Sequence, residues 1–397
     1  MLDGVKVLST SVYLAGPFAT RMLADLGADV IKVEHVDKGD QYRYLGHSYD
    51  EGTPDDLTYR FMQYNRGKES IGLDLKSERG KEIFKSLSEE SDILLENLRP
   101  KQMQKFGLGY ETISALNEDI VYCSLSGYGE TGPYSDRGGV DTLIQAMSGV
   151  VHQNSADADQ PSLTGIYIAD ITGSMYATIS VLAGLVSRYN GHGGTHIDLS
   201  LMDGLVSLLN HEAAQYSSEG SAPPEIKSSL VPQGVYETED GAVALNVLDQ
   251  HWTAFCDILG FDDWIESGEL DDPWARQESK ERVDSRVQSV MKTRPTDAWL
   301  DELLEADILA APVKTVDEAF ANESIQHRDI VREVSDEAIG SYTELDFPAL
   351  FSNYTTTSDD VPRFGEHTPS ILAELGYSED EIAELYVDGV VSDYTET

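Results

Sequence analysis

The first third of the chain alternates short apolar runs with amphipathic segments. Val5–Ser9 and Asp29–Glu34 have the pattern of β-strands, and a helix is expected between them from Pro17 to Leu26, with Gly27 as its stop. Ser77–Ser88 has the spacing of an amphipathic helix, and further strand patterns occur at Ser70–Leu75, Ile93–Asn97 and Ile120–Ser124. Because strands and helices alternate at this spacing, we predict a mostly parallel sheet covered by helices.

The middle of the chain continues with longer apolar segments. Ile171–Arg188 is rich in small and apolar residues on all sides, which predicts a buried helix. Thr195–Ser200 has a strand pattern, and Leu201–Tyr216 has a helical one. Residues 217–232 then hold Ser, Gly, Pro and Lys without periodicity, so we interpret them as a linker.

A smaller mixed domain is expected after this linker, at residues 233–327. Gly234–Val247 has the pattern of a hairpin that turns at Glu239-Asp240-Gly241. Helical patterns follow at His251–Leu259, Asp284–Lys292 and Thr296–Glu305. From residue 328 onward strand patterns return, and the chain closes with two expected helices, Ser370–Leu375 and Glu379–Leu385.

The composition is that of a globular protein with a strong excess of acid. Of 397 residues, 71 are Asp or Glu and 28 are Lys or Arg, which gives a formal net charge of −43, while 40% are hydrophobic and 9% aromatic. Such a chain has enough apolar side chains to bury a core. Its charge repels phosphate backbones and anionic headgroups, so we expect neither a nucleic-acid nor a membrane partner.

The location expected from the sequence is a reducing cytoplasm that is rich in salt. The N-terminus has no basic segment followed by an apolar one, and the longest apolar stretch, near Met175–Val186, is too short to span a bilayer. Cys123 and Cys256 give neither a disulfide framework nor a zinc spacing, so no metal site is expected. Acidic residues are spread along the chain, which suits a salt-rich cytoplasm, where screening over roughly 3 Å at 1 M suppresses self-repulsion. An ordinary acidic enzyme is the alternative.

A glycine-rich motif follows the strand pattern at Ile120–Ser124. Gly127-Tyr-Gly129-Glu-Thr-Gly132 matches G-x-G-x-x-G, the fingerprint of dinucleotide-binding folds. That fingerprint needs a helix to open inside the glycine turn, whereas the following Pro133, Gly138 and Gly139 indicate a long loop. We therefore expect no nicotinamide site.

One segment differs in charge from the rest of the chain. Between Arg60 and Lys105 there are ten basic residues against eight acidic ones, a balance of +2 in a chain of −43. A local basic surplus indicates a site for a polyanionic ligand. For Arg79, Lys81 and Lys85 we favour surface pairing on a helix instead. Near the strand ends, ligand contact and a structural role are equally well supported for Arg66, Lys68, Lys76, Arg99 and Lys105.

Asp170 is the most informative acidic residue. It follows the apolar run Leu163–Ala169 and directly precedes the expected helix at Ile171–Arg188, which is an N-cap position. Taken alone, the residue favours capping. The same geometry also holds an ionised carboxylate in a partly apolar site at a helix N-terminus, where it can act as a nucleophile.

Several segments, in order along the chain, together resemble one family. Asp3–Glu34 (DGVKVLSTSVYLAGPFATRMLADLGADVIKVE) is similar to the N-terminal signature of the family III CoA-transferases, which include formyl-CoA and carnitine CoA-transferases. Further matches, which span almost the whole chain, are Asn65–Lys76 (NRGKESIGLDLK), Leu95–Gly109 (LENLRPKQMQKFGLG), Leu125–Pro133 (LSGYGETGP), Thr296–Ala310 and Gly365–Ser378 (GEHTPSILAELGYS).

The resemblance implies an α/β fold that spacing does not show. A large Rossmann-like domain would be built from both chain ends, residues 1–216 and 328–397, with a small α+β domain at residues 233–327. Two ring-shaped subunits would interlock as a homodimer. The ligand of the basic segment would be CoA, contacted by Val12, Tyr13, Ala15, His35, Leu73, Lys76, Asn97, Leu98 and Lys105. His35 departs from the arginine of some members, which implies weaker phosphate binding.

The catalytic aspartate implied by the resemblance is Asp170, in Gly165-Ile-Tyr-Ile-Ala-Asp170. Its carboxylate would attack an acyl-CoA thioester, form a mixed anhydride and then an aspartyl-CoA thioester, and pass CoA to a free carboxylic acid. Backbone amides around Gly127–Gly132 or Ala15–Gly16 are candidates for the oxyanion donors. Acyl-CoA and a free acid are then the co-substrates, with no permanently bound cofactor and no metal.

Two alternatives stay open beside this hypothesis. The α-methylacyl-CoA racemases share the fold and use a histidine in a G-H-D element, where this chain has Gly139-Val140-Asp141, and valine cannot transfer a proton. A non-catalytic CoA-binding protein would be expected to lose Asp170.

The substrates of the expected transfer are less well defined than the reaction. Salt-adapted members include a succinyl-CoA:mesaconate transferase, so a C4–C5 dicarboxylate pair leads, with Arg137 or His211 as candidates for binding the distal carboxylate. The glycine-rich cover segment of oxalate-specific members has no counterpart near Ser217–Gly234, which disfavours formyl-CoA:oxalate transfer. Carnitine, aromatic acids and simple monocarboxylates remain possible substrates.

Overall fold

The computed structural model describes residues 1–46, 56–155, 160–221, 230–336, 340–356 and 360–394. The chain divides into two compact units. The first consists of Met1–Pro224 together with Arg328–Thr397, and the second of Glu225–His327. The first unit therefore combines segments from both ends of the chain.

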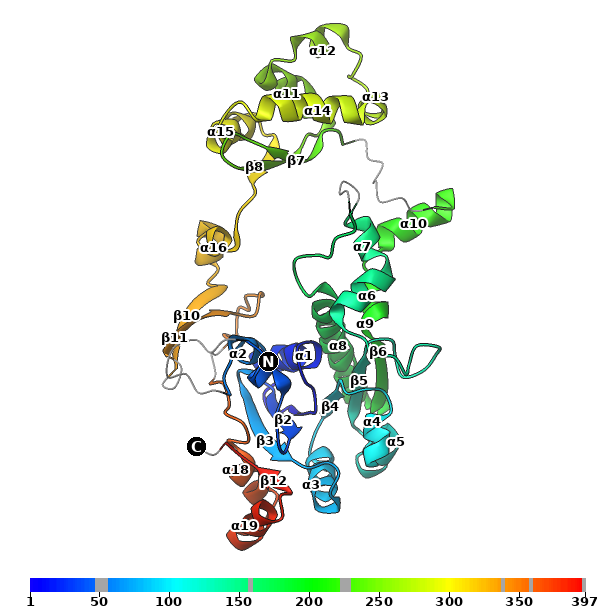
Figure 1. The fold of residues 1–397 in the computed structure, drawn as a ribbon, viewed down its shortest axis with the longest axis vertical. Helices are drawn as coiled ribbons and strands as arrows, with labels where there is room; N and C mark the ends of the chain where they lie inside the picture. Colours follow the sequence, from blue (N-terminus) through cyan, green and yellow to red (C-terminus); the bar gives the residue numbers. More distant parts are fainter. Residues whose placement is uncertain (47–55, 156–159, 222–229, 337–339, 357–359, 395–397) are drawn as a thin grey trace. The chain divides into compact units, whose positions relative to one another are not determined.

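A seven-stranded sheet organises the first unit (Figure 1). Its order is β12-β3-β2-β1-β4-β5-β6, in which β1 to β6 run parallel and β12 pairs antiparallel with β3. The predicted parallel sheet is thus confirmed, and the fold is mixed α/β. The strands are β1 (Lys6–Ser9), β2 (Asp29–His35), β3 (Lys68–Leu73), β4 (Ile93–Glu96), β5 (Val121–Ser126), β6 (Thr195–Ser200) and β12 (Val391–Ser392).

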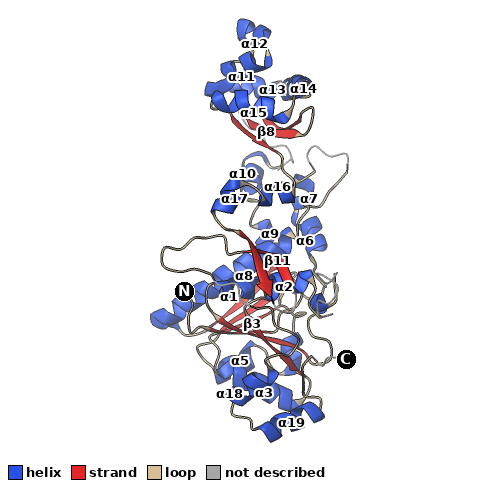
Figure 2. Ribbon diagram, turned by 90° about the vertical axis from the view of Figure 1, so that its left-hand side faces the viewer, coloured by secondary structure: helices blue, strands red, loops and turns tan. Residues whose placement is uncertain are grey.

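Helices cover both faces of this sheet (Figure 2). Neighbouring strand residues point to opposite faces, so Val7 packs into one apolar cluster and Leu8 into the other. The Val7 face is covered by α1 (Ala15–Asp25), α6 (Asp141–Ser148), α8 (Ile168–Ser187) and α9 (Leu201–Val206). The Leu8 face is covered by α3 (Glu78–Glu89), α4 (Gln102–Phe106), α5 (Tyr110–Leu116), α18 (Thr368–Glu374) and α19 (Glu379–Val387).

Local capping explains where two of these helices begin. The Ser77 hydroxyl accepts the Gly80 N–H at 3.0 Å at the start of α3, and Ser378 and Glu381 form a reciprocal capping box at the start of α19. Such side chains satisfy backbone donors that have no partner inside the helix.

A smaller apolar cluster joins the early part of the chain to its C-terminal third. Phe61 and Met62 of α2 (Tyr59–Asn65) pack with Leu14, Tyr42 of the short helix η1 (Gln41–Arg43), and Tyr342. Tyr342 lies in β11 (Gly340–Leu345), which pairs antiparallel with β10 (Val331–Asp336). The segment after residue 328 thereby helps to shape the region around α2.

The second unit has its own antiparallel sheet and apolar core. Its order is β7-β8-β9, and the expected hairpin is present as β7 and β8. The third strand, β9, was not predicted, because it is only four residues long and comes soon after a helix. The elements are β7 (Gln233–Glu237), β8 (Ala242–Asn246), η3 (Asp249–His251), α11 (Trp252–Leu259), α12 (Asp262–Ser267), α13 (Pro273–Glu278), α14 (Lys280–Met291), α15 (Thr296–Glu305), β9 (Leu309–Pro312), α16 (Val316–Phe320) and α17 (Glu323–His327).

The helix expected at Leu201–Tyr216 is wrong, because two helices occupy this region. After α9 the chain leaves the helical path and resumes as α10 (Asn210–Glu219). At the break, the Ser207 hydroxyl donates to the Gly204 carbonyl at 2.7 Å, and the Asn210 side chain donates to the Ser207 carbonyl at 2.6 Å. Since α10 runs to Glu219, it enters the expected linker at 217–232, of which residues 222–229 lie outside the described part of the chain.

The prediction that the helix at Ile171–Arg188 is buried all round is also wrong. One side of α8 packs on the sheet, but Met175, Ile179 and Val186 are 49%, 59% and 60% exposed. With the following turn η2 (Arg188–His192) it is long and apolar enough to cross a membrane by length and composition, contrary to the expectation from sequence. Half of it is buried, as in a core helix.

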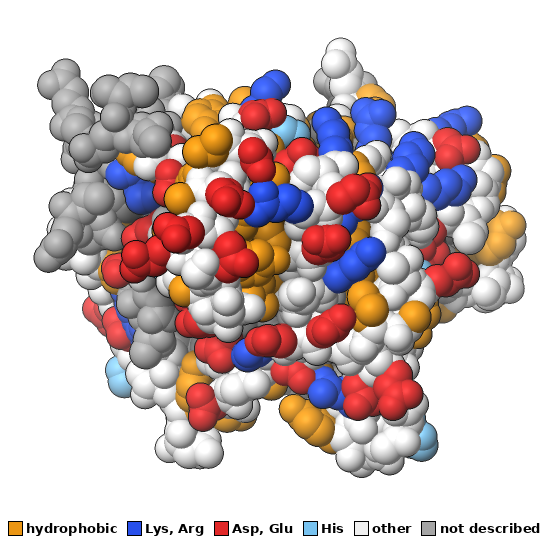
Figure 3. Space-filling view, turned by 90° about the horizontal axis from the view of Figure 1, so that it is seen from below, with side chains coloured by type: hydrophobic (Ala, Val, Ile, Leu, Met, Phe, Trp, Pro, Cys, Tyr) orange, Lys and Arg blue, Asp and Glu red, His pale blue; other side chains and the backbone are white. Residues whose placement is uncertain are grey.

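Acidic side chains are spread over the face of the molecule that Figure 3 presents, with basic side chains between them. This distribution agrees with the composition, in which no single acidic tail carries the charge.

Candidate active site

The carboxyl ends of β1 and β4 meet at a point where the chain order of the sheet reverses. Strands β3, β2 and β1 extend to one side of this point, and β4, β5 and β6 to the other. In open parallel sheets, ligands bind in the crevice outside such a reversal. Asn97, directly after β4, joins the two loops: its Oδ1 accepts the Val12 N–H at 2.7 Å, and its Nδ2 donates to the Val12 carbonyl at 2.9 Å.

The predicted CoA contacts lie along this edge of the sheet. Val12, Tyr13 and Ala15 follow β1, His35 ends β2, Leu73 ends β3 and Lys76 follows it, Asn97 and Leu98 follow β4, and Lys105 lies in α4. The side chains of Ala15 and Leu73 are buried, so a ligand would meet their backbone instead. His35 is exposed, and its Nδ1 accepts the Asp37 N–H at 3.2 Å. The roles of these nine residues in CoA binding stay predictions, but all nine follow or end strands at the carboxyl edge of the sheet.

Two cations of the basic segment are structural and not surface groups. Arg66 is buried, 3.0 Å from an Asp25 carboxylate oxygen and 3.4 Å from one of Glu344. Lys68 is also buried, and its Nζ donates to the carbonyls of Pro17 and Tyr64 at 2.9 and 2.8 Å. Burial lowers the pKa of Lys68 well below its ordinary value. Neither side chain can reach a ligand from solvent, whereas Lys76, Arg99, Lys101 and Lys105 are exposed.

A buried ion pair shapes the loop after β1. Lys32 Nζ lies 2.8 Å from Asp40 Oδ2 and donates to the Ser11 carbonyl at 2.7 Å. The other oxygen of Asp40 accepts the N–H groups of Tyr13 at 3.1 Å and Tyr42 at 3.0 Å. Tyr13 has a φ of 64°, a strained conformation for a residue with a side chain. This pair was not predicted, although a lysine inside the apolar strand DVIKVE was a signal for it.

Asp170 is the third residue of α8, so its predicted N-cap position is wrong. The cap is supplied by Asp141 at the start of α6: its Oδ1 accepts the N–H groups of Ala169 at 2.8 Å and Asp170 at 3.4 Å. Gln145 Nε2 donates to the other Asp141 oxygen at 2.6 Å. Asp170 therefore has its side chain free of the capping role.

The carboxyl of Asp170 is held in an environment that disfavours its charge. Burial, and secondly the charge of Asp141, raise its pKa to about 7. The helix N-terminus favours the ionised form of this carboxyl, whereas burial and the charge of Asp141 disfavour it. A carboxylate with a raised pKa is more basic and more nucleophilic once it is ionised.

The N-terminus of α1 lies against the first turn of α8. The Ser174 hydroxyl is 2.7 Å from the carbonyl oxygens of both Ala15 and Asp170. Among the described residues, the N–H groups of Ala15 and Gly16 have no acceptor. Gly16 approaches so closely that a Cβ would lie 2.4 Å from Ser11 Cβ. Unpaired amides at a helix N-terminus are suited to bind an anion.

The glycine-rich loop is less suited to supply oxyanion donors. Its Gly129 N–H donates to the Ser126 hydroxyl at 2.9 Å, and the Glu130 N–H donates to Asp198 Oδ1 at 3.0 Å. Gly127 packs against Gly139, where an added Cβ would lie 2.5 Å from the Gly139 Cα. As expected, no helix opens inside the glycine turn, since α6 begins only at Asp141.

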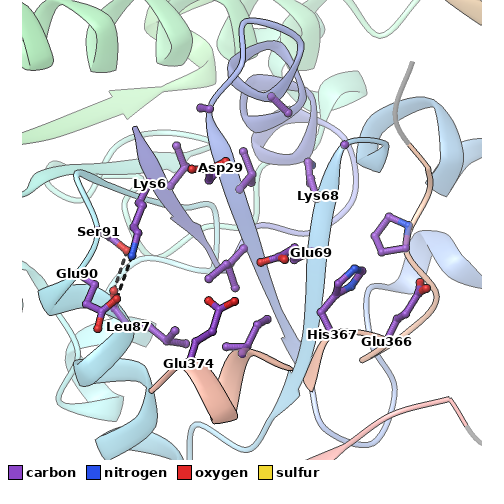
Figure 4. Close-up of a pocket in the computed structure, with 18 of the residues that line it drawn as sticks. Lys6, Asp29, Lys68, Glu69, Leu87, Glu90, Ser91, Glu366, His367 and Glu374 are labelled. Atoms are coloured by element: carbon purple, nitrogen blue, oxygen red, sulfur yellow. Dashed lines mark hydrogen bonds and ion pairs between the residues drawn. The ribbon is translucent and has the colours of Figure 1, made fainter. Parts of the chain in front are cut away.

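A cleft of about 680 Å³ lies elsewhere, at the amino ends of the strands (Figure 4). Its lining includes Lys6 at the start of β1, Asp29 at the start of β2 and Lys68 at the start of β3. Carboxylates predominate around it, among them Glu69 and Glu374. This cleft is at the opposite edge of the sheet from the predicted CoA contacts. In the described residues, no group of three or more His, Cys, Asp or Glu side chains is placed to hold a metal.

Comparison with known proteins identifies the family. The sequence model of CoA-transferase family III matches residues 2–368. The chain belongs to this family. The human succinyl-CoA:glutarate CoA-transferase is 32% identical over 399 residues, covering 99% of this chain and 90% of that protein. The succinyl-CoA:mesaconate CoA-transferase of Haloarcula marismortui is 30% identical, covering 94% of this chain and 96% of that protein.

The fold agrees with solved structures of the same group. A crystal structure of a CAIB/BAIF family protein from Brucella suis matches with a TM-score of 0.84 and 30% identity, covering 94% of this chain and 99% of that one. The family III CoA-transferase described here is therefore an enzyme that takes CoA thioesters as co-substrates and needs no permanently bound cofactor.

Proposed function

We propose that this CoA-transferase moves CoA from the thioester of a dicarboxylic acid, with succinyl-CoA as the leading donor, to a free C4–C5 dicarboxylic acid such as mesaconate. The observation that carries the proposal is Asp170, a half-buried carboxyl with a raised pKa at the helix turn that adjoins the carboxyl edge of the sheet. Relatives named for glutarate and mesaconate support the dicarboxylate class.

The first half of the reaction produces an aspartyl-CoA thioester. An ionised oxygen of Asp170 attacks the thioester carbonyl carbon, and the CoA thiolate leaves, so that a mixed anhydride forms. The thiolate then attacks the aspartyl carbonyl, the donor acid leaves as a carboxylate, and CoA stays joined to Asp170. No proton is gained or lost over these two steps, because one anion attacks and one anion leaves in each.

The second half of the reaction repeats these steps in reverse with the acceptor. Its carboxylate attacks the aspartyl carbonyl and expels CoA thiolate, and the thiolate attacks the acceptor carbonyl of the new anhydride. The product thioester leaves, and the Asp170 carboxylate is regenerated. The thioester energy is kept throughout, so neither ATP nor a metal has a part in the chemistry.

Backbone donors near α1 would stabilise the oxyanion of each step. The N–H groups of Ala15 and Gly16 have no acceptor in the described residues, and Ser174 joins their helix to the turn that carries Asp170. Donors fixed before the reaction stabilise developing charge without reorganisation. We assign the oxyanion site to these two amides in preference to the Gly127–Gly132 loop.

A homodimer is part of the proposal. Helices α6, α8 and α9 lie in one layer, and together they leave apolar side chains exposed on the first unit: Leu143, Met147, Met175, Ile179, Val186 and Val206. Exposed apolar patches of this extent mark association surfaces. A second copy of the chain, interlocked as in the resemblance to the family, would cover them. Ile179→Glu should then shift the mass measured by light scattering to that of a monomer.

The racemase alternative has a specific weakness in this structure. At the position of the proton-transferring histidine the chain has Val140, which is 60% exposed and has no titratable atom. The non-catalytic alternative is disfavoured because Asp170 is retained.

A panel of acyl-CoA donors and free acids, assayed in molar KCl, tests the proposal. Wild type should transfer CoA between dicarboxylates, Asp170→Ala should not, and hydroxylamine should label the peptide that contains Asp170. Transfer by Asp170→Ala, or a label elsewhere, would contradict the covalent mechanism. Exchange of α-deuterium with solvent would point to the racemase.

A further inference from the structure

Arg60 has a guanidinium that is oriented by tyrosines and not by a carboxylate. It is the second residue of α2, and its Nε donates to the Tyr59 hydroxyl at 3.1 Å. Its guanidinium carbon lies 5.7 Å from the centre of the Tyr59 ring and 5.9 Å from that of Tyr42. Within the part of the chain that is described, Nη1 and Nη2 have no acceptor and no carboxylate at ion-pair distance. In a chain with 71 acidic residues, such an unpaired guanidinium stands out.

Tyr42 belongs to a buried cluster against which Tyr64 and Ile171, the residue after Asp170, both pack. Burial and the carboxylate of Asp170 raise the pKa of Tyr42, and the charge of Arg60 opposes that rise. Burial is the largest cause of the raised pKa of Tyr64. The charge of Asp170 raises this pKa further, and the charge of Arg60 lowers it. Tyr42 lies 6.2 Å from Tyr64 and 5.5 Å, edge-on, from Tyr13, measured between ring centres. Tyr42 therefore lies beside the Arg60 guanidinium and within the cluster against which Ile171, the residue after Asp170, packs.

We propose that Arg60 binds the distal carboxylate of the acyl group while the acyl carbonyl carbon lies at Asp170. The inference rests on the proposed transfer chemistry at Asp170, and it assigns the residue that selects dicarboxylic acids. A guanidinium with both Nη groups unpaired can donate two parallel hydrogen bonds to a carboxylate, an arrangement that a lysine ammonium cannot form. The exposed Tyr59 ring and the half-buried Tyr64 ring offer an apolar surface for the methylene groups between the two carboxylates.

Arg137, which is with His211 a candidate for this role from the sequence, has a different setting. Its guanidinium stacks on the Tyr134 ring at 3.9 Å, and the side chain is exposed in the loop between β5 and α6. No contact joins Arg137 to Tyr42 or Tyr64 within the described residues. It is thus a matched control: an exposed arginine on an aromatic ring that lacks the shared neighbours of Asp170.

The test compares two donors of equal chain length, succinyl-CoA and butyryl-CoA, which differ by the distal carboxylate. Labelling of Asp170 by hydroxylamine in a single turnover reports the first half-reaction without any acceptor. Arg60→Gln removes the charged hydrogen bonds to the distal carboxylate. The efficiency of labelling with succinyl-CoA, divided by that with butyryl-CoA, should therefore fall about tenfold or more. Arg60→Lys should fall between Arg60→Gln and wild type, and Arg137→Gln should keep the wild-type ratio.

The outcomes separate this inference from the proposed function. If wild type labels Asp170 and Arg60→Gln keeps the wild-type ratio, the assignment of Arg60 is wrong and the covalent mechanism stands. If Arg60→Gln loses labelling equally with both donors, Arg60 has a general role and the assignment is again wrong. If neither donor labels Asp170 in wild type, the proposed function fails, and this inference fails with it.

Discussion

Asp141 accepts the backbone N–H of Asp170 at 3.4 Å and that of Ala169 at 2.8 Å, and so caps the helix that carries the proposed nucleophile. One carboxylate thereby positions another. The same closeness makes the charge of Asp141 a cause, after burial, of the raised pKa of Asp170. The position and the basicity of the Asp170 carboxyl are therefore linked through a residue 29 positions earlier in the chain.

The pKa of Asp170 predicts an acid limb in the activity profile. Only the ionised carboxylate attacks, and burial together with Asp141 raises the pKa to about 7. Activity should therefore be full above this value and lost as the pH falls through it, about tenfold per pH unit in kcat/KM. A profile of kcat/KM against pH checks this, and a midpoint near 4 would contradict it.

Replacing Asp141 should separate its cap from its charge. Asp141→Asn keeps an oxygen acceptor for the Ala169 N–H but removes the negative charge, so the midpoint of the pH profile should move to lower pH. Asp141→Ala also removes the cap, which should lower the free energy of unfolding by about 1 kcal/mol. Asp136→Asn, at an exposed aspartate in the preceding loop, is the control and should change neither quantity. An unmoved midpoint in Asp141→Asn would show that burial alone sets the pKa.

Asn97→Ala should weaken the binding of every acyl-CoA to a similar extent. The change removes both hydrogen bonds that join the loops after β1 and β4 at Val12. With about 1 kcal/mol for each bond, KM for acyl-CoA should rise roughly tenfold or more. The preference among acids should not change, because Asn97 is not expected to touch the acyl group. Asn154→Ala, at an exposed asparagine, is the control, and a changed acid preference in Asn97→Ala would refute this role.

Arg43 should be essential for the stability of the first unit. It is fully buried, and its Nε and Nη2 donate to the two oxygens of Glu34 at 2.8 and 2.7 Å, while Nη1 lies 3.3 Å from Asp56. Arg43→Gln leaves the buried Glu34 carboxylate without its ion-pair partner, while Asp56 keeps Arg363 at 2.7 Å, so the free energy of unfolding should fall by about 3 to 5 kcal/mol. The exposed pair of Arg79 with Asp388 gives a control, and Arg79→Gln should cost less than about 1 kcal/mol. Equal losses in urea unfolding would refute this account.

The same network predicts how acid unfolds the protein. Burial opposes ionisation of Glu34, but the charge and hydrogen bonds of Arg43 hold its pKa at about 2, below the ordinary value of 4.5. A group whose pKa is lower in the folded than in the unfolded state stabilises the fold at pH values above its unfolded-state pKa. This stabilisation is lost as the pH falls through the folded-state pKa. This contribution should therefore disappear between pH 4.5 and 2 in wild type, and be absent from Glu34→Gln.

Salt should stabilise the protein if it is adapted to a salt-rich cytoplasm, as the charge of −43 indicates. Screening over roughly 3 Å at 1 M weakens repulsion among the exposed carboxylates. The melting temperature should then fall when the protein is dialysed from molar KCl into dilute buffer, and return on adding KCl. An unchanged melting temperature would mark an ordinary acidic enzyme.

Where the pattern is local, the sequence was a good guide to the structure. The strand pattern at Asp29–Glu34 corresponds to β2, and that at Ile93–Asn97 corresponds to β4, because alternation and apolar runs reflect the path of the chain itself. Family motifs led to the CoA-transferase fold and activity, which the comparisons support. They also led to Asp170, whose role stays a prediction.

Tertiary structure decided what each charged residue does. Arg66 and Arg60 are close in sequence and alike in type, yet Arg66 is buried against Glu344, while Arg60 lies over the rings of Tyr59 and Tyr42 and has no carboxylate partner among the described residues. Asp141 was notable in the sequence only as the neighbour of Val140, and it proved to cap the helix that carries Asp170. Burial and electrostatic pairing depend on residues far apart in the chain, so local patterns determine the elements, and packing determines the chemistry of their side chains.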